Sequence, residues 1–108
     1  MDQLAWIALL GAGCCEVLAT TCIKLSDGMR LVRWLVGFVA TMCGSLYLLS
    51  VAVHEIPIGT AYAVWTGIGA VGTAAAGMWA FGESKAAARI ACLLLIIAGV
   101  VGLRVSAG

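Results

Sequence analysis

The sequence predicts an all-α membrane protein, with four transmembrane helices in a single domain that spans residues 1–108. The chain is 64% hydrophobic and 10% charged, with a mean hydropathy of +1.15. A soluble protein of this composition would expose far larger apolar patches than monomers tolerate. Four apolar stretches are each about 20 residues long, enough for a helix to cross the ~30 Å hydrocarbon core.

Three short polar segments join the four spans. The first, residues 24–28, reads Lys-Leu-Ser-Asp-Gly and is typical of a turn, the second contains Pro57, and the third begins at Gly82. The N-terminal Met-Asp-Gln lacks the basic region of a signal peptide, so we expect the first span to be part of the working protein. The predicted spans are residues 4–23, 31–53, 58–81 and 86–105.

Glu16 is the strongest functional signal because it is the one charged residue between Gln3 and Ile23. A charge within a span costs at least ~2.5 kcal/mol on insertion, so such residues usually line a cavity or carry a function. Small residues at helical spacing around it predict a face that a ligand or another helix can approach: Ala12, Gly13, Ala19 and Thr20. The alternative is a structural carboxylate that pairs with a polar group of a neighbouring helix.

Lys and Arg are distributed unevenly among the joints. Five of the six fall in the first and third joints or at their edges: Lys24, Arg30, Arg33, Lys85 and Arg89. Arg104 is the sixth. The positive-inside rule therefore predicts that these joints face the cytoplasm and that both termini face outward. Four short helices without an internal repeat can hardly enclose a water-filled path, so we also expect an oligomer in the lipid bilayer.

Two other patterns have simpler explanations than a cofactor site. Residues 67–72, Gly-Ile-Gly-Ala-Val-Gly, match the dinucleotide fingerprint but lie inside an apolar span with no preceding strand. Glycines at this density favour close approach between helices. The five cysteines lie within predicted spans and form no C-x-x-C pair, so we interpret them as packing residues. The sequence thus predicts no cofactor, no metal site, no nucleic-acid partner and no enzymatic activity.

Tyr62 and Trp65 share one face of the third span because they are three residues apart. Aromatic faces attract cations, so near a carboxylate this pair would suit a cationic ligand; core packing is the alternative. Ser45 is in the middle of the second span, where its hydroxyl can bond to the carboxylate or to the preceding turn. Small residues of the fourth span predict a helix–helix contact: Ala98, Gly99 and Gly102.

Taken together, these motifs resemble the small multidrug resistance transporters over essentially the whole chain. The matching features are Ala12-Gly-x-x-Glu16, the stretch from Pro57 to Gly72, and Gly-x-x-Gly-Leu in the fourth span. Trp65-Thr-Gly resembles the guanidinium-exporter branch, since the polyaromatic-cation branch usually has Ser after that Trp. Guanidinium exporters also carry Trp three residues after the glutamate, where this chain has Ala19. We therefore expect Ala19 to enlarge the site.

The resemblance implies an antiparallel dimer in the bacterial inner membrane that exchanges protons for small organic cations at Glu16. It places Ser45, Tyr62, Trp65 and Gly13 at the substrate and proton site, and the fourth span at the dimer contact. Some members pair two different subunits of opposite charge bias, in agreement with the 5:1 distribution of Lys and Arg. A paralogous partner is therefore expected, with a homodimer as the alternative.

Burial itself favours such exchange, because a carboxylic acid shielded from water takes up a proton more readily than a solvated one. Proton and cation would then compete for Glu16. The sequence favours guanidinium-type substrates. The alternatives are an exporter of lipophilic or polyaromatic quaternary ammonium compounds and, further from the pattern, a membrane assembly subunit that transports nothing.

Overall fold

The computed structural model of the chain describes residues 2–107 and contains four α-helices in that range. Each predicted span coincides with a helix to within two residues at either end. The helices are α1 (Asp2–Leu25), α2 (Val32–Ala52), α3 (Ile58–Ala80) and α4 (Ala87–Ala107). The predicted all-α fold class is confirmed.

Among the described residues, three helices are long and apolar enough to cross a membrane, namely α1, α2 and α4, and α3 is not one of them. The helix α3 is 23 residues long, so length is not the reason. Its sequence instead contains five glycines together with Thr, Tyr and Trp residues, which lower its hydropathy. Some of these residues, including Tyr62, Trp65, Gly69 and Gly72, approach α1 or line a cavity, as described below.

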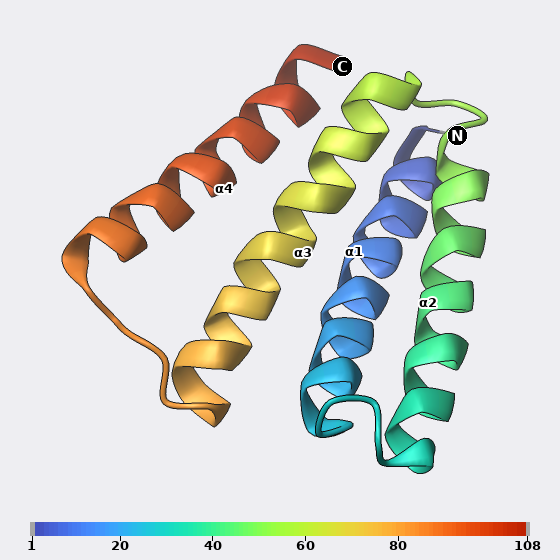
Figure 1. The fold of residues 1–108 in the computed structure, drawn as a ribbon. Helices are drawn as coiled ribbons and strands as arrows, with labels where there is room; N and C mark the ends of the chain where they lie inside the picture. Colours follow the sequence, from blue (N-terminus) through green and yellow to red (C-terminus); the bar gives the residue numbers. More distant parts are fainter. Residues whose placement is uncertain (1, 108) are drawn as a thin grey trace.

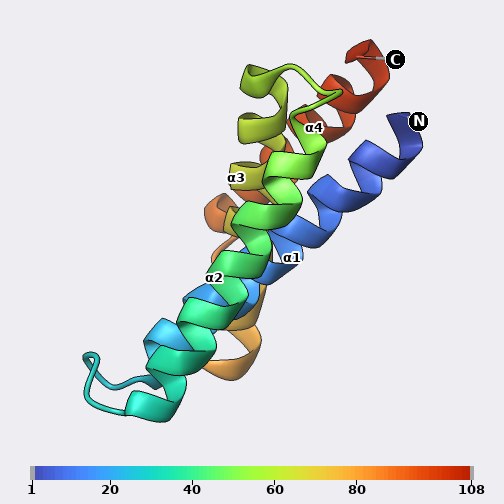
Figure 2. The same ribbon diagram turned by 90° about the vertical axis from the view of Figure 1, so that its right-hand side faces the viewer.

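The four helices lie side by side in the order α2, α1, α3, α4 (Figures 1 and 2). The described chain measures 42 × 34 × 17 Å. Because one helix with its side chains is about 10–12 Å across, a slab 17 Å thick is less than two helices deep. The backbone of helix α4 approaches that of α3 alone among the described helices, and most of the apolar side chains of α4 are exposed. One copy therefore does not form a closed bundle.

The joints after α1 and α3 lie at one end of the slab, and the joint after α2 lies at the other end with the outer ends of α1 and α4 (Figure 1). At the first of these ends, Ser26 is fully buried and shapes the turn that follows α1. Its hydroxyl donates to the Ile23 carbonyl (2.7 Å) and accepts from the Met29 N–H (3.1 Å). The turn predicted at residues 24–28 is thus an ordered, internally bonded one.

The hydrophobic core lies at the opposite end, where α1 begins, α2 ends and α3 begins. Its buried members are Ala5, Trp6, Leu9, Ala52, Ile56, Ala61 and Val64. Trp6 is near a span end, and such a position suggests an anchor at the membrane surface. It is 8% exposed instead, with the Arg104 guanidinium 5.0 Å from its ring centroid. The hydrophobic core thus fills the end of the structure at which α3 begins, and the cavity described below extends toward the end at which α3 stops.

Glycines allow α3 to approach both of its neighbours, as the interpretation of residues 67–72 predicts. A Cβ on Gly67 would lie 2.8 Å from a methyl group of Val100 in α4. A Cβ on Gly72 would overlap the Val17 side chain of α1. Glycine is therefore required at these positions for packing, because any side chain would push the helices apart.

Candidate functional site

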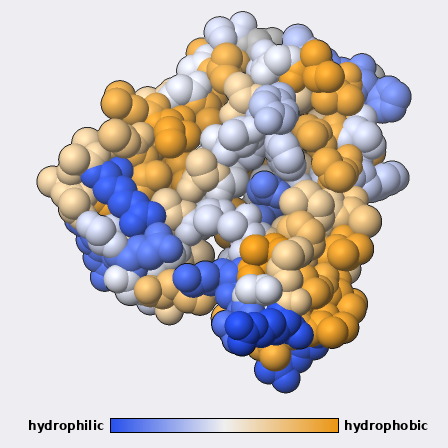
Figure 3. Space-filling view, viewed as in Figure 1, coloured by the Kyte–Doolittle hydropathy of each residue, from blue (hydrophilic) through white to orange (hydrophobic). Residues whose placement is uncertain are grey.

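A cavity of about 580 Å³ lies between α1 and α3 and extends to the joint after α3. Figure 3 shows this face of the molecule hollowed between the helices, with hydrophilic side chains gathered toward the end that carries the joints after α1 and α3. Two carboxylates, one guanidinium, two aromatic rings and three threonine hydroxyls line it. The lining residues are Glu16, Thr20, Tyr62, Trp65, Thr66, Gly69, Ala70, Thr73, Ala74, Glu83 and Arg89.

A second cavity of the same volume, about 580 Å³, is bounded by α1, α3 and α4. Its lining is almost wholly apolar and contains residues such as Val17, Ile68, Val71 and Val100. A lining of this kind offers a cation no charge or hydrogen-bond partner. The cavity that contains Glu16 is therefore the candidate functional site, on chemical grounds and not on size.

Glu16 lies in the middle of α1 with its carboxylate at the cavity. Its Oε1 atom is buried and has no hydrogen-bond partner among the described residues. The nearby Thr20 hydroxyl donates to the backbone carbonyl of Glu16 instead (2.9 Å). A buried acceptor without a donor is unfavourable, so this oxygen is suited to bind a proton or a cation that brings its own N–H groups. The described residues do not supply the helix partner that a purely structural carboxylate would need.

Gly69 of α3 provides the space for this carboxylate. A Cβ at this position would lie 2.8 Å from Cγ of Glu16, closer than real Cβ contacts. As predicted, another helix approaches the small-residue face around Glu16. The missing side chain at Gly69 of that helix leaves space for the carboxylate.

Tyr62 and Trp65 share one face, as predicted, and both line the cavity with Glu16. Their ring centroids are 5.7 Å apart and the rings are tilted by 46°. Tyr62 is 59% exposed in the single chain, so the pair is not simply core packing. Two ring faces beside a carboxylate can surround a cation and attract it through their quadrupoles.

Ser45 takes neither of the two roles predicted for its hydroxyl. The hydroxyl donates to the Ala12 carbonyl of α1 (2.6 Å) and accepts from Nε1 of Trp65 (2.9 Å). Ser45 is fully buried and does not line the cavity. The physical reason is that α2 packs closely against α1, so the Ala12 carbonyl oxygen of α1 lies within hydrogen-bonding distance of the Ser45 hydroxyl. Ser45 therefore positions Trp65.

Gly13 and Ala19 also lie outside the cavity lining. Gly13 faces Ile68 of α3, where a Cβ would overlap the Ile68 side chain, so it is a packing position. Ala19 is fully buried. The expectation that Ala19 enlarges the site is wrong, because this side of α1 is covered by helix packing and does not open onto the cavity.

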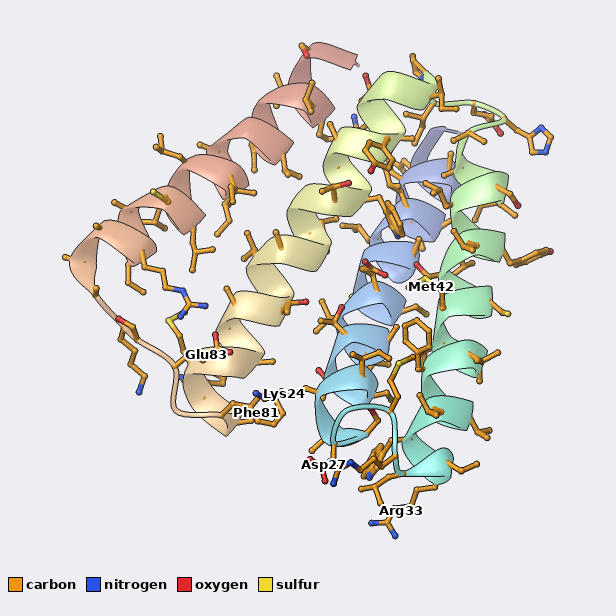
Figure 4. The ribbon with its side chains drawn as sticks, in the orientation of Figure 1. Lys24, Asp27, Arg33, Met42, Phe81 and Glu83 are labelled. Carbon is orange, nitrogen blue, oxygen red and sulfur yellow. The ribbon has the colours of Figure 1, made fainter. Side chains whose placement is uncertain are left out.

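Sequence reasoning missed several lining residues. Thr66, Gly69 and Thr73 follow Tyr62 at intervals of three or four residues, so a helical face drawn through the aromatic pair would have found them. Glu83 and Arg89 join the cavity only because the joint after α3 folds back over it. Figure 4 shows Glu83 at this end of α3, on the side toward α4, with Lys24 and Phe81 close together nearby. No local periodicity predicts that placement.

Residues 4–96 match the family described as Small Multidrug Resistance protein. The chain belongs to the small multidrug resistance family. A protein named Guanidinium exporter from Yersinia pseudotuberculosis is 49% identical over 104 residues, covering 95% of this chain and 99% of that relative. A protein of the same name from Citrobacter freundii is 45% identical over 103 residues, covering 95% and 98%. One from Salmonella typhimurium is 44% identical over 104 residues, covering 96% and 99%.

Membership in the small multidrug resistance family confirms the predicted resemblance. Together with three helices long and apolar enough to span a bilayer, it identifies the chain as a membrane protein. In this small multidrug resistance protein, the cavity with Glu16, Tyr62 and Trp65 is the place where chemistry suited to a cation gathers.

Proposed function

We propose that this protein is a proton-coupled antiporter that exports small guanidinium-type cations, with proton and cation competing for Glu16. The observation that carries the proposal is the buried, unpartnered Oε1 of Glu16 in a cavity that also holds Tyr62 and Trp65. A guanidinium ion fits this arrangement because it is planar, permanently charged and rich in N–H donors that match a carboxylate. Its flat face can lie against an aromatic ring.

Competition for one carboxylate is sufficient to couple the two ions. Glu16 cannot hold a proton and a cation at the same time, and either of them satisfies its buried oxygen. If the site changes sides only when occupied, cation export is driven by proton entry, at about 1.4 kcal/mol per pH unit. The membrane potential contributes about 2.3 kcal/mol per 100 mV for each net charge moved.

The substrate class is supported by the relatives that carry the name Guanidinium exporter at 44–49% identity over nearly the whole chain. The bilayer concerned would be the bacterial inner membrane. Transport by binding and release needs no nucleophile, metal or cofactor, so we propose a transporter and not an enzyme.

Export of quaternary ammonium compounds is the second candidate, and the aromatic pair favours it. Tyr62 and Trp65 would attract any organic cation, including one without N–H donors. Such a cation would leave Oε1 of Glu16 without a hydrogen bond. The burial of Ala19 also removes the larger site expected for bulky substrates. We therefore place guanidinium compounds first.

We further propose that the working unit is an antiparallel pair, preferably with a paralogous subunit of opposite charge bias. The thin slab and exposed α4 support a second subunit, since one copy leaves the cavity incompletely walled. Nothing in the described chain approaches within 4 Å of a Cβ built on Gly99 or Gly102, so this small-residue face of α4 is free for a partner helix. A homodimer is the alternative.

Proteoliposome exchange tests the proposal. Purified protein, alone and with a candidate partner, is reconstituted with radiolabelled guanidinium and an internal pH-sensitive dye. We expect guanidinium movement in one direction to drive proton movement in the other, and ethidium-like dyes to compete weakly. Stronger competition by dyes than by every guanidinium compound would instead favour the quaternary ammonium exporter, and guanidinium flux without proton flux would contradict the coupling.

A further inference from the structure

Glu83 is a second carboxylate in the cavity that contains Glu16, and the fold provides specifically for its position. Gly82 ends α3 with a φ of +66°, a conformation that glycine adopts without strain. The Glu83 N–H donates to the Gly77 carbonyl (3.0 Å). Gly77 is buried, and a Cβ there would overlap the Glu83 carboxylate. Two glycines thus allow the joint after α3 to place a carboxylate over the end of the cavity.

This second carboxylate is held by a guanidinium group that belongs to the protein itself. Nη2 of Arg89 lies 2.8 Å from Oε1 of Glu83, and Nη1 of Arg89 donates to the Ser84 carbonyl (3.0 Å). Both charged side chains line the cavity. The pair is the only ion pair within residues 2–107 and is partly exposed, at 32% for Arg89 and 44% for Glu83. Ion pairs with this exposure are weak and exchange readily.

We propose that Glu83 is an outer cation-binding residue on the route to Glu16, and that Arg89 occupies it as an internal surrogate for the transported guanidinium ion. The inference rests on the proposed function. A guanidinium ion that arrives at this end of the cavity replaces the Arg89 guanidinium on Glu83, because the two groups offer a carboxylate the same N–H donors. The cation then passes to Glu16 and Arg89 returns to Glu83. Arg89 therefore lowers the apparent affinity of the protein for guanidinium, and Glu83 raises that affinity.

Lys24 is another cation at this end and lines a smaller cavity together with Glu83, but the structure gives it a different contact. Its Nζ lies 5.8 Å from the ring centroid of Phe81, and it forms no ion pair with Glu83 in the described structure. Its point-like ammonium also lacks the planar donor geometry of Arg89. We therefore assign to Arg89, and not to Lys24, the competition with guanidinium for Glu83.

The test compares the Michaelis constant for guanidinium exchange in proteoliposomes among the wild-type protein, Glu83→Gln, Arg89→Gln and the double variant. Removal of Glu83 should raise the constant about two- to fivefold, and removal of Arg89 should lower it by a similar factor, the range expected for a partly exposed ion pair. In the Glu83→Gln background, Arg89→Gln should change little, since no carboxylate is left for Arg89 to occupy. Glu55→Gln, in the joint after α2, and Arg30→Gln, before α2, are the matched controls and should behave as wild type.

The directions in which the Michaelis constant shifts in Glu83→Gln and Arg89→Gln distinguish two roles for the ion pair. One role is competition with guanidinium, and the other is a structural link between the joint after α3 and α4. A tether between α3 and α4 predicts that both single variants impair exchange in the same direction, and that result would overturn the inference, as would no shift in Arg89→Gln. If Glu83→Gln does not fold, the sign of the Arg89→Gln shift decides. If the expected changes in the Michaelis constant are not observed, the proposed function still stands as long as the wild type exchanges guanidinium and Glu16→Gln does not. A wild type that moves no guanidinium overturns both proposals.

Discussion

The indole N–H of Trp65 donates to the hydroxyl of Ser45 (2.9 Å), and this contact connects the cavity to the packing of three helices. The same hydroxyl donates to the Ala12 carbonyl of α1 (2.6 Å), so α3, α2 and α1 meet at one buried serine. Because Ser45 is fully buried, it acts on the site through Trp65 and not by touching a ligand. The orientation of the aromatic wall thus depends on a residue outside the cavity.

Replacement of Ser45 by Ala should weaken guanidinium binding about threefold or more while the protein remains folded, because Trp65 loses the acceptor that fixes its ring. The Michaelis constant for exchange measures the effect. Ser50→Ala is the matched control, since the Ser50 hydroxyl is exposed and bonds only to Tyr47 of its own helix (2.6 Å). Equal constants in the two variants would contradict the positioning role.

Replacement of Gly69 by Ala should reduce transport by about tenfold or more, because the new Cβ would lie 2.8 Å from Cγ of Glu16 and force the carboxylate or the helix to move. Initial rates at saturating guanidinium, compared at equal amounts of folded protein, measure the loss. Gly59→Ala provides the control, since a Cβ at Gly59 meets nothing within 4 Å. A Gly69→Ala protein with wild-type rates would show that the carboxylate does not need this space.

Replacement of Glu16 by Gln should abolish both guanidinium binding and proton movement, because the amide keeps the shape of the side chain and removes the charge. Binding by calorimetry and exchange in proteoliposomes are the measurements, and the elution volume on size exclusion checks the fold. Glu55→Gln removes a carboxylate from the joint after α2, outside the cavity lining, and should leave both activities intact. Transport that survives in Glu16→Gln would exclude the proposed competition for one carboxylate.

A cysteine at position 106 should react only with reagents added outside the cell, and one at position 84 only with reagents that reach the cytoplasm. Five of the six Lys and Arg residues lie in or beside the joints after α1 and α3, which share one end of the structure (Figure 1). The positive-inside rule predicts that this end faces the cytoplasm. Whole-cell labelling of Ser106→Cys and Ser84→Cys, with and without a candidate partner, makes the measurement. Labelling of both positions from both sides, with full transport by this chain alone, would indicate a homodimer of dual orientation.

Local properties of the sequence determined the four helices and the main candidate residue of the site. Apolar stretches of membrane length specify spans wherever they occur, so their ends were predicted to within two residues. Glu16 is an isolated charge in such a stretch and needs no neighbours to be recognised. A spacing of three residues places Tyr62 and Trp65 on one helical face in any α-helix. The stretch from Pro57 to Gly72 was sufficient to indicate the family.

Tertiary structure decided how each helix is rotated against its neighbours, and periodicity within one helix carries no information on that rotation. It gave Ser45 the partners Ala12 and Trp65 in place of Glu16, and it buried Ala19 in the packing of α1. The fold of the joint after α3 also brought Glu83 into the cavity, through a left-handed glycine and a buried one. These contacts depend on which helix surfaces pack most closely against one another. That packing is determined only when all the helices are in contact.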